Sequence, residues 1–142
     1  MSRTPAARAT LTLIAAALCT LALAACGSTV ATSAYSGEQR AVAQTISNLQ
    51  ADATAAEQKK ICANDVSAEV VNRLGGTAGC EAAIKSQLGE IDNLEAKIKS
   101  IDIAAGATTA TAQVSSTFAG KSTTATVSLV KEGKVWKVSG VS

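Results

Sequence analysis

Near Lys97, the spacing of the apolar residues along this chain changes from that of a helix to that of a strand. Before it, apolar residues recur every three or four positions; after it, they alternate with polar residues. The alternating residues fall into four groups: Ile101 and Ile103; Ala110, Ala112, Val114 and Phe118; Ala125, Val127 and Leu129; and Trp136 and Val138. Each strand thus has one apolar face and one face of Thr, Ser or Lys. This pattern predicts an antiparallel sheet that is covered on one side.

The residues before Lys97 predict helices with recognisable starts and stops. Four helices are expected: one opened by a capping box at residues 36–39 (SGEQ), one capped by Asp52 and running through Cys62, one capped by Ser67 and running to Leu74, and one from about Gly79 to Leu94. The pair Gly75-Gly76 ends the third helix.

Helices first and strands after predict a two-layer α+β domain, with N-terminal helices packed on one face of a C-terminal antiparallel sheet of about four strands. Glu132-Gly133 and Gly120 predict the hairpin turns. We expect Trp136 to join the core, because an exposed indole would leave the largest apolar side chain of the domain in water. The third strand should follow the same alternation: Ala125, Val127 and Leu129 toward the helices, and Thr124, Thr126 and Ser128 toward solvent.

The N-terminus has the form of a bacterial export signal. Arg3 and Arg8 precede a charge-free apolar run, from Leu11 to Ala25, that is shorter than the roughly 20 residues of a spanning helix. The run ends in Leu-Ala-Ala-Cys at residues 23–26, which matches the lipobox of bacterial lipoproteins. The pattern predicts a signal peptide (1–25), a mature chain that begins at Cys26, a flexible tether (26–37) and one domain (38–142). The alternative is an ordinary signal peptide cut near Ala25.

Acylation of Cys26 would decide the location of the protein. A diacylglyceryl group carries two acyl chains such as palmitate, and two chains give a stable membrane anchor where one binds marginally. We therefore expect a lipid-anchored protein on the extracytoplasmic face of the cell membrane, with the lipid bilayer as its partner through Cys26.

Cys62 and Cys80 are the only two cysteines left after Cys26 is acylated, because Cys19 lies in the signal. In an exported chain this favours a disulfide bond. The alternatives are two buried free thiols or a metal site. A metal site is disfavoured, because two thiolates without histidine do not complete a tetrahedral zinc site.

Three stretches of the mature chain carry a family resemblance: residues 42–49, residues 61–81 with a cysteine near each end, and residues 129–141 (LVKEGKVWKVSGV). In these the chain resembles the nuclear transport factor 2-like (cystatin-like cone) superfamily and, more narrowly, uncharacterised small lipoproteins of high-GC Gram-positive bacteria. The resemblance implies a curved sheet wrapped around helices, often with a pocket between them. The superfamily spans enzymes, binding domains and adaptors, so the fold assigns no function.

Composition excludes some classes of function. The chain has no histidine, which removes the commonest general base and metal ligand. Outside the signal the acidic and basic residues balance, so no electrostatic footprint for nucleic acid is present. No cofactor or metal is expected, and no position matches a catalytic motif.

Two kinds of function remain. The first is a non-catalytic module that binds a small apolar ligand or an envelope protein, or an adaptor that acts only by being tethered. An open apolar cavity would favour the ligand, and a filled interior would favour the adaptor. The alternative is a cone-fold enzyme, of isomerase or hydrolase type, acting on a small hydrophobic substrate. It would need a buried acid among Asp65, Asp92 and Asp102. Phe118 and Trp136 are candidates for lining a ligand pocket, although their phase on the strands favours the core.

Overall fold

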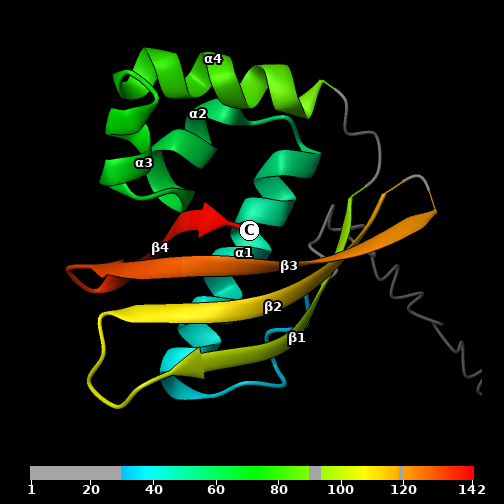
Figure 1. Ribbon diagram of the computed structural model, residues 1–142, viewed down its shortest axis with the longest axis vertical. Helices are drawn as coiled ribbons and strands as arrows, with labels where there is room; N and C mark the ends of the chain where they lie inside the picture. The colour runs from blue at the N-terminus through cyan, green and yellow to red at the C-terminus, as the bar shows by residue number, and fades with distance from the viewer. Residues whose placement is uncertain (1–29, 90–93, 119) are drawn as a thin grey trace, which may run out of the picture.

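The computed structural model describes residues 30–89, 94–118 and 120–142, without the side chain of Phe118. Helices precede strands along the chain (Figure 1). The elements are α1 (Gly37–Thr54), α2 (Gln58–Lys60), the π-helix η1 (Ile61–Asp65), α3 (Ala68–Arg73), α4 (Gly76–Leu88), β1 (Glu95–Ile103), β2 (Thr109–Phe118), β3 (Lys121–Glu132) and β4 (Val135–Val141). The predicted α+β class, with helices before an antiparallel sheet of four strands, is confirmed.

The four strands form a meander in the order β1-β2-β3-β4, and every neighbouring pair is antiparallel. Both predicted hairpin turns are present. Gly133 has φ +64° in the turn between β3 and β4, a conformation that glycine adopts without strain. The sheet twists and curves in Figure 1, and the register shifts once in each of the two outer pairings, at Ile98/Ser100 and Ser128/Leu129. Such bulges bend a strand and increase its twist.

Helix α1 lies across one face of the sheet and contacts both edge strands, β1 and β4 (Figure 1). Its side chains donate to backbone carbonyls near both edges: Gln39 to Ile101 at 3.0 Å, Thr45 to Trp136 at 3.1 Å, and Gln50 to Leu94 at 2.7 Å. Edge strands otherwise present unpaired backbone groups. These bonds tie α1 to both edge strands, while its apolar residues pack in the core.

The core contains the residues that the period of two predicted. Val127, Leu129 and Trp136 are buried, and Trp136 is only 2% exposed. Thr124 on the opposite phase is exposed, whereas Thr126 is half-buried and its hydroxyl accepts a hydrogen bond from Gln113 across the strands at 2.8 Å. Ala125, predicted toward the helices, and Ser128, predicted toward solvent, are both half-buried. The prediction for β3 is therefore confirmed for Val127, Leu129 and Thr124, while cross-strand pairs cover part of the polar side.

Several predicted helix boundaries were wrong. Asp52 lies inside α1, which continues to Thr54, so Asp52 caps no second helix. Ser36 is the N-cap residue of α1, but its side chain makes no capping bond, and the side chain of Gln39 bonds to β1 instead. Ser67 does cap α3: its hydroxyl accepts from the backbone N–H of Val70 at 3.3 Å.

The fourth helix is shorter and earlier than expected. It begins at Gly76, immediately after the glycine turn, and ends at Leu88, while β1 begins at Glu95. The turn between α3 and α4 is tight, and Gly79 in the first turn of α4 allows it. A Cβ at position 79 would lie 1.9 Å from the carbonyl oxygen of Leu74. No other residue can bring the first turn of α4 so close to the end of α3.

The domain also begins earlier than predicted. Val30 is 6% exposed and belongs to the apolar core, and Tyr35 packs against that core. The backbone carbonyl of Tyr35 accepts a bond from Arg40 Nε at 2.8 Å. Residues 30–36, assigned to the tether from their small and polar composition, therefore pack on the domain, because Val30 and Tyr35 bury apolar surface there.

Candidate functional site

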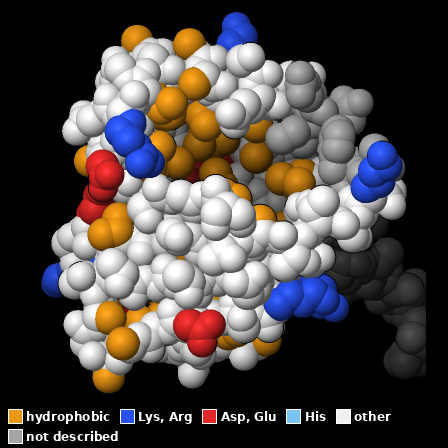
Figure 2. Space-filling view, viewed as in Figure 1, with side chains coloured by type: hydrophobic (Ala, Val, Ile, Leu, Met, Phe, Trp, Pro, Cys, Tyr) orange, Lys and Arg blue, Asp and Glu red, His pale blue; other side chains and the backbone are white. Residues whose placement is uncertain are grey.

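An apolar cavity of about 380 Å³ lies between the helices α1, η1, α3 and α4 and the end of β4. Figure 2 shows it as a hollow in which hydrophobic side chains gather, between the upper helices and the sheet. Its volume falls in the range of small-molecule sites, about 300–1,000 Å³. Its lining side chains are mostly aliphatic: Leu49, Ala53, Ile61, Val66, Val70, Leu74, Ala83, Ile84, Leu88, Leu94, Val138 and Val141, with Arg73, Gln87, Ser139 and Gly140.

Apolar residues line the cavity up to the surface of the molecule. Leu74 is 38% exposed and Val141 is 65% exposed, and both belong to the lining. Exposed apolar side chains beside a cavity mark a surface that a ligand or partner can cover. Among the described residues Arg73 is the one ionisable lining residue, and its exposed guanidinium makes two long contacts at the rim, with Nη2 donating to Ser139 O at 3.3 Å and Nη1 3.9 Å from Glu69.

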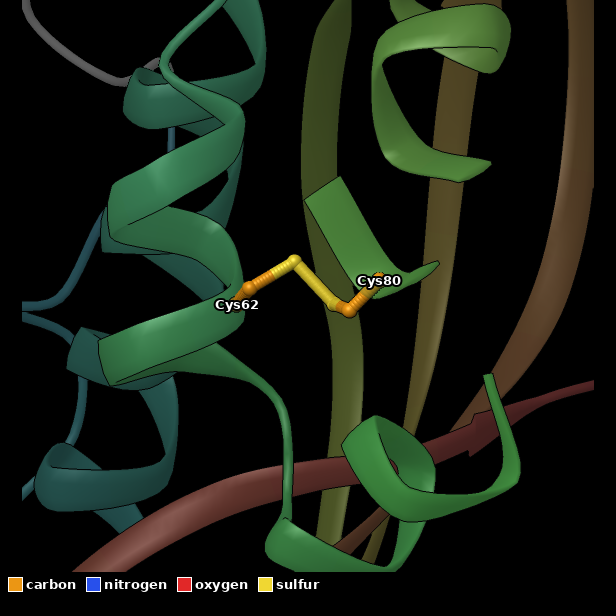
Figure 3. The surroundings of a disulfide bond; sticks show 2 residues. All are labelled: Cys62 and Cys80. Carbon is orange, nitrogen blue, oxygen red and sulfur yellow. A yellow bond between two sulfur atoms is a disulfide. The ribbon is translucent and has the colours of Figure 1, made fainter. Parts of the chain in front are cut away.

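A disulfide joins Cys62 on η1 to Cys80 on α4 (Figure 3). The two Cα atoms are 6.0 Å apart, and Cys80 has no exposed surface. Cys62 lies on η1, next to the lining residue Ile61, and Cys80 lies in α4, three residues before the lining residue Ala83. The predicted disulfide is confirmed, and it joins two of the helices that form the cavity.

Asp65, the last residue of η1, is a buried acid with an incompletely satisfied carboxyl. It is 2% exposed, and its Oδ2 has no hydrogen-bond partner among the described residues. Burial raises the pKa of Asp65 to about 7, helped by the charge of Asp52 and a hydrogen bond with it, and opposed by the charge of Lys137. Lys137 in turn donates to the backbone carbonyls of Ala63 and Asn64 on η1.

The three aspartates on which the enzyme alternative depends have different positions. Asp65 is buried, Asp102 is exposed, and Asp92 lies outside the described residues. Ile61, one helical turn before Asp65, and Val66, directly after it, line the cavity, but Asp65 itself does not. The cavity therefore brings no carboxyl group to a bound molecule from the part of the chain that the structure describes.

Of the two aromatic candidates, Trp136 does not line the cavity. Trp136 is buried in the core, and its indole Nε1 donates to Glu38 Oε2 at 2.7 Å, while Lys131 Nζ donates to Glu38 Oε1 at 2.7 Å. These two donors, Lys131 first, hold the pKa of Glu38 below its usual value. The side chain of Phe118, like Cys26, lies outside the described residues.

The sequence pattern identified only part of the lining. Ile84 and Leu88 belong to the predicted apolar face of the fourth helix, but nothing in their spacing indicates a cavity beside them. Leu74 carries a weak signal, since it is a large apolar residue next to a glycine turn, where exposure is expected. Arg73 carries no signal, because charged residues at helix ends are common.

Over residues 30–89, 94–118 and 120–142 no helix is both long and apolar enough to cross a bilayer, and no group of three or more Cys, Asp or Glu residues is arranged to hold a metal ion. Comparison of the chain with protein-family models, with curated proteins and with solved structures found no match.

Proposed function

We propose that this protein is an extracytoplasmic bacterial lipoprotein, anchored through Cys26, that binds a small aliphatic molecule in the cavity below α4. The observation that carries the proposal is the aliphatic lining, to which η1, α4 and β4 all contribute. The interior of the domain was the feature expected to separate a ligand-binding module from an adaptor, and a cavity of this size favours the ligand. The helices on a four-stranded antiparallel sheet, with a cavity between, fit the nuclear transport factor 2-like resemblance.

The lining also supports binding rather than catalysis as the proposed role. Aliphatic side chains offer burial and shape, whereas acid–base catalysis needs a titratable group within hydrogen-bonding reach of the substrate. Arg73 is always charged and donates only, so it suits the recognition of a polar or anionic group at the rim.

The cavity can be tested by filling it from one wall. Ala83→Leu adds a larger side chain to the lining, and Ala82→Leu adds the same group to the exposed neighbouring position. Straight-chain fatty acids of increasing length serve as probes. A bound probe raises the melting temperature, because it stabilises the folded state by linkage. We expect such a shift in the wild type and in Ala82→Leu, and its loss in Ala83→Leu. Equal shifts in the two variants would contradict the site.

The anchor can be tested separately. Cys26→Ser should leave the precursor unprocessed or release the protein from the membrane fraction, because no thiol remains to accept the lipid. Cys19→Ser is the matched control and should leave processing and anchoring unchanged, since Cys19 lies within the signal. The measurement is membrane fractionation with intact mass of the mature chain. Normal anchoring of the Cys26→Ser protein would rule the proposal out.

A further inference from the structure

The chain enters the folded domain very soon after the proposed lipid attachment site. Val30 is already buried in the core, and Cys26 lies four residues before it. Four residues of fully extended chain span at most about 14 Å. A lipid at Cys26, on which this inference rests, therefore holds the surface around Val30 within about that distance of the bilayer.

The segment that follows Val30 shows which part of the domain this is. Ala31, Ala34 and Tyr35 form one wall of a hollow of about 510 Å³, and the other walls come from the first half of β1 and the last residues of β2. In Figure 1 the blue segment before α1 accordingly runs beside β1. The described chain thus starts near the end of the sheet where β1 begins, β2 ends and β3 begins, which we call the basal end.

The basal end is rich in lysine. Lys97 and Lys99 on β1 and Lys121 at the start of β3 are all exposed, and among the described residues none of them forms an ion pair. Among the described residues, Glu95 is the single acidic side chain that lines the hollow. On the face seen in Figure 2, blue Lys and Arg side chains lie at the right edge. Lysines at a membrane surface are attracted to anionic lipids within about one Debye length.

The opposite end of the sheet lies far from the anchor. Strand β3 has 12 residues, which corresponds to a length of about 40 Å at about 3.3 Å per residue. The loop between β1 and β2, residues 104–108, is at that far end and carries no charge. The lysines beside it, Lys131 and Lys134, are accompanied by Glu38, Glu132 and Asp102, and Lys131 is paired with Glu38 at 2.7 Å. The two ends therefore differ in distance from the lipid, and among the described residues the lysines of the far end are balanced by acids.

We propose that the basal end rests on the anionic headgroups of the bilayer that holds Cys26, so that the domain has one defined orientation on the membrane. The short segment between Cys26 and Val30 keeps the basal end close to the bilayer. The three lysines at that end are attracted to the anionic headgroups. The apolar cavity meets the basal end at the start of β1, where Leu94 lines the cavity and Glu95 lines the hollow. In this orientation, that edge of the cavity is on the membrane side.

The test compares two labels on the lipidated protein. Because the native cysteines are acylated or disulfide-bonded, Ser122→Cys and Thr108→Cys each introduce one free thiol, at the basal end and the far end respectively. Each variant is labelled with a fluorophore and reconstituted in vesicles of phosphatidylcholine and phosphatidylglycerol that contain a headgroup spin-labelled lipid. We expect several-fold stronger quenching of the label at position 122. Equal quenching, or stronger quenching at position 108, would overturn the orientation.

A charge variant tests the lysines in the same assay. In the labelled Ser122→Cys protein, Lys97→Glu with Lys121→Glu should reduce the quenching in anionic vesicles. Lys59→Glu with Lys85→Glu, a control pair on the helices with both residues exposed, should not. Equal effects of the two pairs would contradict the electrostatic contact. Intact mass and vesicle flotation are measured first: a chain without lipid at Cys26 overturns the anchor and this inference together, whereas a lipidated chain with equal quenching overturns only the orientation.

Discussion

The single tryptophan shows how one residue connects distant parts of this chain. Trp136 is buried on β4, yet its indole N–H reaches Glu38 in the first turn of α1, and Lys131 lies 5.7 Å from the centre of its ring. Its burial could be predicted, because it falls in phase with the apolar face of its strand. Its partner could not, because Glu38 is separated from it by almost the whole domain.

Asp65 gives the clearest prediction at the scale of one residue. Burial first, and then Asp52, raises its pKa from 3.8 to about 7, so between these values the folded protein holds a proton that the unfolded chain has lost. The free energy of unfolding should therefore fall as pH rises through that window, by at most about 1.4 kcal/mol per pH unit. Asp65→Asn should flatten this dependence and stabilise the protein above pH 7.

Urea denaturation at a series of pH values measures this effect. Asp102→Asn is the matched control, because Asp102 is exposed and its replacement should leave the pH dependence unchanged. A pH profile of Asp65→Asn that superimposes on the wild-type profile would show that Asp65 is ionised in the folded protein.

At the scale of elements, the stability of the helical layer depends on the Cys62–Cys80 bond. The two cysteines are 18 residues apart, and closing a loop of this size stabilises by roughly 3 kcal/mol in the chain-entropy model. Replacing both cysteines with serine should lower the free energy of unfolding by about that amount. Affinity for a cavity ligand should also fall, because α4 loses its covalent link to η1.

The reduced wild-type protein is the control for this prediction. Its stability in urea should match that of the double variant, and its intact mass should exceed that of the oxidised protein by two hydrogens. Quantitative labelling of both cysteines in the native protein, without prior reduction, would contradict the bond.

The whole molecule is organised around one core. Helix α1 contacts both edge strands, and Trp136 on β4 packs in the same core as Val42 and Leu129. Because the two layers share these contacts, we expect them to unfold together. Tryptophan fluorescence, which reports on the core around Trp136, and far-UV circular dichroism should give coincident transitions in urea. Separate midpoints would mean that the helical layer around α3 and α4 unfolds on its own.

Much of the fold followed from local patterns in the sequence. The period of two set the faces of the strands, and the glycines at positions 120 and 133 set the turns. The two cysteines that remain outside the predicted signal and its lipobox predicted the disulfide. Helix ends were less predictable: Asp52 is a good capping residue and yet lies within α1, since the tertiary contacts of a long helix outweigh the preference of one residue.

The tertiary structure alone decided the candidate site. The cavity brings together residues as distant as Leu49, Ile84 and Val138, and a shared wall between such residues leaves no periodic signal in the sequence. It also decided that Asp65 is buried and that Val30 belongs to the core. Sequence by itself determined which face of each strand is apolar, because neighbouring residues alternate sides whatever packs on them. Which apolar residues enclose a space depends on how the layers meet, and only the folded chain shows that.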